Sequence, residues 1–274
     1  MIPAKMGFHD QDKANALMQS EGKYFFIRSL AKGIHILELL SDNEALTVTQ
    51  VAKLMNMNRA GSHRFLSTLK ELGYADKDES SRYYLTSKVI ELGMKVLDRF
   101  EVRKIARPFL QELSTKFNES INLGYFNGEE VLTIDKIDST EILRMDAGIG
   151  GGEPAYCTSL GKAILAFLPD TQLEEYLQKI ELTPFTPNTV ISKDKLKEEL
   201  MHIKENGYSI DDEELSEGLR CIGAPLFDHN GQALYAISIS GPSIRMGSKR
   251  IEEIQRELKK ICKNLSGKMG NHYF

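Results

Sequence analysis

A chain of 274 residues with 41% apolar and 27% charged side chains is long enough for two domains, and this composition argues against global disorder. Its 35 basic and 39 acidic residues give a net charge of -4. This charge excludes a protein that covers nucleic acid with a uniformly basic surface, but it permits a local basic surface. The three cysteines, Cys157, Cys221 and Cys262, lie far apart, which disfavours a disulfide framework or a zinc knuckle and favours a reducing cytoplasm.

The chain begins with a polar, charged segment, and we expect residues 1–24 to form a flexible N-terminal arm. This segment lacks the apolar stretch of a secretion signal. No apolar run in the sequence is long enough to span a bilayer, so we expect no membrane partner.

Residues 25–86 carry the pattern of three helices followed by a β-hairpin, which is the order of a winged helix-turn-helix. Thr47 and Gln50 have the spacing of a capping box, in which each side chain satisfies a backbone amide where a helix begins. Gly73 is a typical signal for the end of a helix. The predicted elements are helices over Ser29–Leu40, a short stretch carrying Val51–Met55, and Arg59–Leu72, then strands over Tyr74–Lys77 and Arg82–Leu85.

The third predicted helix has an apolar and a polar side, and the polar side is the candidate DNA-reading surface. Residues 45–74 contain four cationic side chains and a single acid, Glu71. The apolar side, expected to pack on the other two helices, is Gly61, Phe65, Leu69 and Leu72. The side expected to stay exposed includes Arg59, Ser62, His63, Ser67 and Lys70.

Recognition helices enter the major groove with their N-terminal end first, which sorts the polar residues into two groups. Candidates for contacts to base edges are Asn58, Arg59, Ser62 and His63. Candidates for phosphate contacts are Arg64, Lys70 and Arg82. The alternative is a three-helix interaction module with a solvated polar side. The capping box, the short turn, the hairpin and the local charge together favour DNA.

A linker helix is predicted over residues 87–100, with apolar positions on one side that could also serve dimerisation. Residues 101–274 mix strands and helices in the manner of an α+β effector-binding domain with a largely antiparallel sheet. The predicted strands are Ser120–Phe126, Val131–Ile137, Cys221–Phe227 and Leu234–Ser240, and the predicted helices lie near Leu160–Leu168, Leu173–Ile180, Lys195–Asn206 and Ile251–Leu265.

Small residues alternate on one side of two predicted strands. Ser238 and Ser240 share a face with Ala236, while Cys221 and Gly223 point away from the large apolar residues of their own strand. Such a face leaves room above it and predicts a small-molecule pocket.

The helix start around Thr158 and Ser159 could complete that pocket. Either residue can cap the helix, and the first amides of a helix attract an anion, so the pattern is compatible with an organic-acid site. The alternative is plain N-capping with nothing bound.

Three C-terminal segments, residues 207–214, 218–225 and 236–242, closely resemble the signature of the IclR (isocitrate lyase regulator) family of bacterial transcription factors. The winged helix-turn-helix segment through Leu85 and the helix start at 158–163 fit the same family. The resemblance covers residues 26–265. It implies a winged helix-turn-helix head, a linker helix and a GAF-like effector domain, in a homodimer or dimer of dimers that binds a palindromic operator. Repression and activation both stay open.

The resemblance also implies a set of effector contacts. They fall on Ser159, Leu160, Asp211, Cys221, Ser238 and Ser240. Many members have histidine where this chain has Tyr156, and the segments 154–159 and 59–66 resemble the branch that regulates aromatic-acid catabolism. Tyr156 is therefore a further effector candidate, with an aromatic carboxylate preferred and short keto acids open.

The competing functions are an enzyme and a ligand-binding protein that does not touch DNA. Gly161 and Lys162 do not complete a phosphate loop, because Tyr156 stands at the first glycine position and Ala163 where serine or threonine should follow. Cys221 has no histidine near it in sequence to activate it as a nucleophile. We therefore predict no catalytic residue, no cofactor and no metal site.

Overall fold

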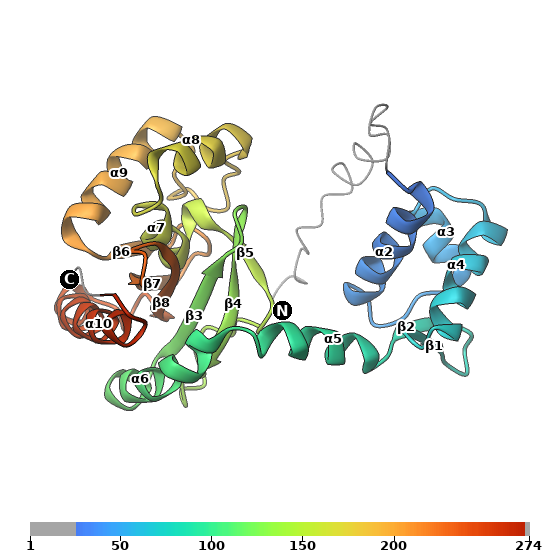
Figure 1. Cartoon of the computed structure of the whole chain (residues 1–274), viewed down its shortest axis with the longest axis horizontal. Helices are drawn as coiled ribbons and strands as arrows, with labels where there is room; N and C mark the ends of the chain where they lie inside the picture. The colour runs from blue at the N-terminus through green and yellow to red at the C-terminus, as the bar shows by residue number, and fades with distance from the viewer. Residues whose placement is uncertain (1–25, 272–274) are drawn as a thin grey trace. The chain divides into compact units, whose positions relative to one another are not determined.

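The computed structural model describes residues 26–271, and the predicted N-terminal arm lies outside them (Figure 1). The contacts within the chain separate it into two compact units, with the division between Arg99 and Phe100. No helix within the described residues combines the length and the apolar character that a membrane span requires.

The first unit is a winged helix-turn-helix, as the sequence predicts. The capping box is formed: Thr47 Oγ1 accepts from the Gln50 amide at 3.3 Å, and Gln50 Oε1 accepts from the Thr47 amide at 2.9 Å. The two wing strands pair antiparallel, and Leu46 adds a bridge to Tyr83. The elements are α2 (Arg28–Ser41), α3 (Val48–Leu54), α4 (Arg59–Glu71), β1 (Ala75–Lys77), β2 (Tyr83–Leu85) and α5 (Lys88–Leu97).

The buried side of α4 matches the prediction only in part: Leu69 is buried and Phe65 packs against the same core, as predicted. Its buried residues are Ser62, Leu66 and Leu69, whereas Leu72 is 54% exposed. The predicted exposure of Ser62 is therefore wrong. A small side chain at this position lets α4 pack closely, and the Ser62 hydroxyl donates to the Asn58 carbonyl at 3.2 Å within the helix.

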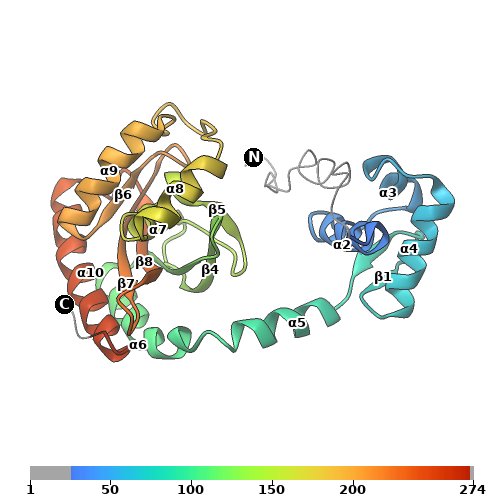
Figure 2. The same cartoon turned by 45° about the horizontal axis from the view of Figure 1, so that its top comes forward.

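The second unit is a six-stranded antiparallel sheet with helices on both faces, and Figure 2 shows it from a second side. The strand order is β5-β4-β3-β8-β7-β6. The strands are β3 (Ser120–Phe126), β4 (Glu130–Ile137), β5 (Gly152–Pro154), β6 (Ser209–Asp212), β7 (Leu219–Phe227) and β8 (Ala233–Pro242). The helices are α6 (Glu101–Phe117), the short turn η1 (Ala155–Cys157), α7 (Ser159–Leu165), α8 (Asp170–Lys179), α9 (Lys193–Asn206) and α10 (Ser248–Lys268).

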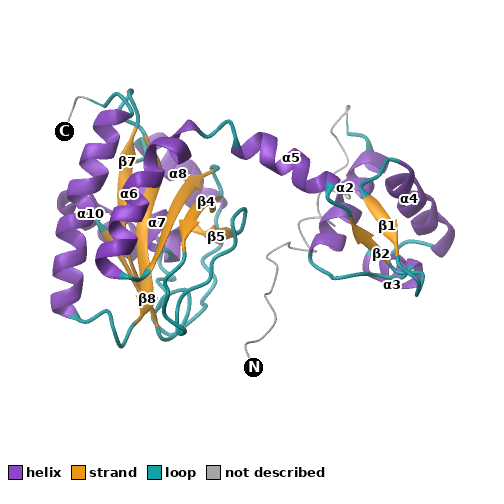
Figure 3. Cartoon of the chain, turned by 90° about the horizontal axis from the view of Figure 1, so that it is seen from below, coloured by secondary structure: helices purple, strands orange, loops and turns teal. Residues whose placement is uncertain are grey.

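Helices α6 and α10 pack together on one face of the sheet, and α7 packs on the other with α8 and α9 on its outer side (Figures 1 and 3). Along β8, Ile237 and Ile239 are buried on the face of α6 and α10, while Ser238 and Ser240 are buried on the face of α7. The sheet therefore has one ordinary apolar face and one face whose small polar residues admit the start of α7.

Candidate functional site

Small residues on β7 and β8 form a shallow patch against which α7 begins. The register places Cys221 opposite Ser240 and Gly223 opposite Ser238. A Cβ atom on Gly223 would lie 2.4 Å from the Ser159 carbonyl oxygen, so only glycine permits this approach of helix to sheet. The small residues are thus the reason that the N-terminus of α7 lies directly on the sheet.

Helix α7 begins as the sequence predicts. Thr158 Oγ1 accepts from the Gly161 amide at 3.2 Å and so caps the helix. Ser159 and Leu160 lie in its first turn, where backbone amides have no acceptor inside the helix. The cap therefore presents the first turn of α7 to the space above the sheet.

A narrow cavity of about 10 Å³ lies at this junction, which is about the room that one water molecule needs. Six of the seven predicted effector residues line it, namely Ser159, Leu160, Asp211, Cys221, Ser238 and Ser240. Its other walls are Asn122, Thr133, Met145, Glu153, Thr158, Leu215 and Leu219. The structure therefore brings together residues from all six strands of the sheet, the start of α7 and two loops around one small space.

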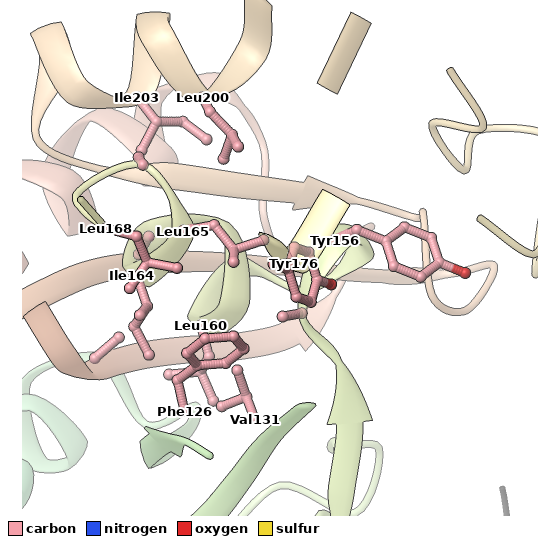
Figure 4. Packing of buried hydrophobic residues seen from close by; sticks show 14 of the residues in the cluster. Phe126, Val131, Tyr156, Leu160, Ile164, Leu165, Leu168, Tyr176, Leu200 and Ile203 are labelled. Atoms are coloured by element: carbon pink, nitrogen blue, oxygen red, sulfur yellow. The ribbon is translucent and has the colours of Figure 1, made fainter. Parts of the chain in front are cut away.

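Tyr156, the seventh predicted effector residue, does not line the cavity. Its ring is buried in the neighbouring core and turned away from the labelled leucines and isoleucines (Figure 4). Its hydroxyl donates to the Thr183 carbonyl at 2.7 Å and accepts from the Thr183 amide at 2.9 Å. The ring also stacks on Phe185, with centroids 6.4 Å apart. Tyr156 therefore ties the loop at residue 183 to η1.

Sequence reasoning missed several cavity residues. Asn122 on β3 donates to the hydroxyls of Ser238 and Ser240, both at 3.4 Å, and its alternation with Gly124 could have placed it on the same face. Met145 comes from the loop after β4, where its carbonyl accepts from the Ser120 hydroxyl at 2.7 Å. No local pattern predicts a loop residue brought in by tertiary packing.

Two carboxyl groups, Asp211 and Glu153, face this cavity, and burial makes both harder to ionise than they are in water. Burial raises the pKa of Asp211 to about 6, although the Glu214 amide, which donates to Asp211 at 2.8 Å, and the positive charge of Lys162 both oppose the shift. Burial also raises the pKa of Glu153. The pKa of the Cys221 thiol is raised by burial, so this group is protonated at neutral pH and is a poor nucleophile.

The predicted DNA contacts on α4 differ in their exposure and in whether their side chains already have a partner within the protein. Arg59, His63 and Arg64 are exposed. Asn58 is exposed too, but its side-chain oxygen caps α4 by accepting from the Gly61 amide at 2.7 Å. This leaves the amide nitrogen of Asn58 for other partners.

The two remaining phosphate candidates are paired with acids of the wing. Lys70 forms an ion pair with Asp76, and Arg82 forms one with Asp78 at 2.8 Å. Both pairs are exposed, and pairs of this kind are weak in water. A DNA phosphate could displace either carboxylate, but only by breaking the existing ion pair. Within the described residues, no such pair has to be broken at Arg64.

Comparison with known proteins agrees with this geometry. Residues 29–79 match the IclR helix-turn-helix domain. Residues 94–267 match the domain described as bacterial transcriptional regulator IclR C-terminal. Together these two matches cover both units of the chain.

Individual relatives match over most of their length. The HTH-type transcriptional regulator KdgR of Escherichia coli (strain K12) is 35% identical over 247 residues, which cover 90% of this chain and 94% of KdgR. The Pca regulon regulatory protein of Pseudomonas putida is 33% identical over 230 residues, which cover 83% and 79% of the two chains. The crystal structure of Thermotoga maritima IclR is 35% identical with a TM-score of 0.74, covering 89% of this chain and all of that one. These nearly equal identities do not single out the aromatic-acid branch.

Proposed function

Because the chain belongs to the IclR family of bacterial transcriptional regulators, we propose that a small organic acid bound in the cavity at α7 controls how its winged helix-turn-helix binds an operator. The observation that carries this proposal is the cavity itself. It gathers polar and charged groups from most elements of the second unit around one small space, which a bound acid would have to widen.

The first turn and a half of α4 is the proposed base-reading surface. Arg59 and His63 are exposed and lie one turn apart, which suits contacts to neighbouring bases in a major groove. Asn58 contributes at most its amide nitrogen. Ser62 is not part of this surface, because its side chain is buried. Arg64 is the proposed phosphate contact, with Lys70 and Arg82 as secondary contacts that must first leave their acidic partners.

The cavity favours an effector that both donates and accepts hydrogen bonds. Two carboxyl groups, Asp211 and Glu153, would repel a second anion unless the ligand offers them a proton donor. The hydroxyls of Ser238 and Ser240 and the first turn of α7 can in turn donate to a ligand carboxylate. A small hydroxylated carboxylic acid meets both demands. The argument for an aromatic acid is weaker, because Tyr156 lies outside the cavity.

Pairing of two chains is proposed through α5. Ile90, Leu92, Met94 and Val96 are between 47% and 65% exposed, which is unusual for large apolar residues on one short helix. Leu92 and Val96 share one side of α5, and Ile90 and Met94 share another. A dimer that buries one of these pairs would present two α4 helices to a palindromic operator. The effector then acts by favouring one arrangement of the dimer over another.

The DNA part of the proposal is tested by selecting binding sites from a random duplex pool and measuring affinity by gel shift. Arg59→Ala should weaken binding to the selected site by about tenfold or more, because a bidentate base contact contributes roughly 1–3 kcal/mol. The matched control is Lys179→Ala, an exposed charge on α8. Equal affinities of the two variants would refute this assignment of α4.

The effector part is tested by a thermal-shift screen of hydroxylated, keto and aromatic carboxylic acids, since a ligand that binds only the folded state raises its apparent stability. The Ser238→Val, Ser240→Val double variant should lose both the thermal shift and the response of operator affinity to the acid. It should keep operator binding itself. An unchanged thermal shift in the double variant would show that the acid binds elsewhere.

A further inference from the structure

A second hollow in this unit shares no residue with the effector cavity. It lies between the C-terminal end of α9, the end of β7 and the second half of α10. Its volume is about 260 Å³, just below the roughly 300–1,000 Å³ of typical small-molecule sites.

The hollow exists because β7 continues beyond its outer neighbour. Strand β6 starts at Ser209, opposite Gly223, so residues 224–227 of β7 have no strand on that side. Gly207, with a φ of 74°, ends α9 in the left-handed region and turns the chain into β6. The end of α9 and the side of α10 form the two walls.

This end of β7 is protected against pairing with another strand. Pro225 has no backbone N–H, and the Phe227 amide donates to the Ser266 hydroxyl at 3.0 Å. Proline and occupied amides are common means of blocking an exposed sheet edge. An added β-strand is therefore a poor occupant, and a small molecule is a better one.

The floor of the hollow is apolar. Phe167 and Phe227 meet edge to face with centroids 5.1 Å apart, and Pro225 extends the same surface. An apolar ligand body would bind favourably here, because it removes this apolar surface from water.

The rim of the hollow is positively charged. Lys204, Lys259 and Lys263 line it, against one acid, Glu205. Lys259 donates to the Asn206 carbonyl at 3.1 Å and lies over the Tyr208 ring. Within residues 26–271, neither Lys204 nor Lys263 has a carboxylate partner within ion-pair distance. Two ammonium groups are thus free to meet a ligand anion beside the apolar floor.

We propose that this hollow is a second ligand site, separate from the effector cavity, for an amphipathic organic anion such as a medium-chain fatty acid. The apolar floor takes the chain, and Lys204 and Lys263 hold the carboxylate. The effector cavity is narrow and carries two acids of its own, so the two sites select different ligands.

The absence of tryptophan from the sequence makes a clean binding assay possible. Phe167→Trp places a single fluorophore in the floor, and octanoate is the probe. A saturable change in fluorescence is expected, together with a rise in the thermal midpoint of the unsubstituted full chain. If neither protein responds to octanoate at concentrations below its micelle formation, the proposal is wrong.

Charge-reversal variants identify the site. In the Phe167→Trp background, Lys204→Glu with Lys263→Glu should weaken octanoate binding by about tenfold, because two attractive charges are replaced by two that repel the carboxylate. Lys195→Glu with Lys260→Glu is the matched control, because it makes the same charge change on the same two helices outside the hollow. Equal weakening by both pairs, or equal binding of octanoate and the uncharged octanol, would overturn the charged-rim assignment. Retention of octanoate binding in the Ser238→Val, Ser240→Val variant is expected, and its loss would place the probe in the effector cavity.

Discussion

The Lys162 ammonium and the Glu214 carboxylate form an ion pair inside the second unit, where the Lys162 side chain is wholly buried and that of Glu214 is 8% exposed. Glu199 of α9 accepts from the same ammonium at 2.5 Å. The Glu214 amide donates to Asp211 on the cavity wall. One buried cation thus joins α7, α9 and the turn after β6, and it holds Asp211 in place on the cavity wall.

Removal of this cation should destabilise the protein strongly. Lys162→Met leaves two carboxylates facing each other with the Glu214 side chain still buried, and breaking a buried pair in this way typically costs about 3–5 kcal/mol. Urea unfolding followed by circular dichroism measures the loss. Lys162→Met combined with Glu214→Gln should recover part of it, because no buried charge at 214 is then left unpaired. A decrease of less than about 1 kcal/mol in the free energy of unfolding of Lys162→Met would show that the ion pair contributes little to stability.

The pKa of Asp211 predicts a dependence of stability on pH. Its pKa rises from an ordinary 3.8 to about 6 on folding, so between these values the folded chain holds a proton that the unfolded chain releases. Stability contributed by this proton is present at low pH and is lost as pH rises through 6. Asp211→Asn keeps the acceptor for the Glu214 amide but has no proton to lose. Its free energy of unfolding, compared with that of the wild type, should therefore rise by about 1 kcal/mol from pH 5 to pH 7.

Urea unfolding at pH 5, 6 and 7 tests this difference. The control is Glu217→Gln, an exposed acid close by in the same turn, which should track the wild type at every pH. A pH-independent difference between Asp211→Asn and the wild type would mean that burial does not hold a proton on this group.

Elements with a strong local pattern were predictable from the sequence. The predicted and observed bounds of β3 agree, and α4 starts at Arg59 as expected, because alternation and capping are written in neighbouring residues. Helix α6 was not predicted. Its buried positions follow helical spacing, but Pro108 lies among them, and proline inside a pattern argues against a helix.

Among the cavity residues, too, those with a local sequence pattern were predictable and those without one were not. The small face of β8 was predictable, because Ser238 and Ser240 alternate with isoleucines along the strand. Glu153 was not, because β5 is three residues long and joins the sheet only through β4. The orientation of Tyr156 depends on the Thr183 backbone, and no local signal links residues so far apart.

Two glycine-to-alanine substitutions should have opposite effects. A Cβ on Gly161 would lie 2.1 Å from the Ala155 carbonyl oxygen, so backbone must move, at a cost of about 1–3 kcal/mol or more. A Cβ on Gly267 of α10 meets no atom within 4 Å, and alanine there should stabilise the helix by up to about 1 kcal/mol. Thermal midpoints should fall for Gly161→Ala and rise slightly for Gly267→Ala. Equal midpoints would contradict the close packing of α7 on η1.

The contact of Phe100 with the sheet predicts a variant in which effector binding no longer changes operator binding. Its ring packs against Tyr125 of β3 and Tyr235 of β8, with centroids 5.0 and 6.4 Å apart. The same two strands carry cavity residues on their other face. A shift of these strands on effector binding would therefore reach Phe100, which directly follows the segment carrying α5.

Phe100→Ala should leave effector affinity nearly unchanged but reduce the effect of the effector on operator affinity. Couplings of this kind are typically about 5–150-fold, and the variant should lose most of that factor. Gel shifts with and without saturating effector measure it, and thermal shifts measure effector affinity separately. Phe100→Tyr keeps the ring and should keep the coupling. Full coupling in Phe100→Ala would mean that the signal reaches α5 by another contact, and loss of effector binding would assign Phe100 to the stability of the fold.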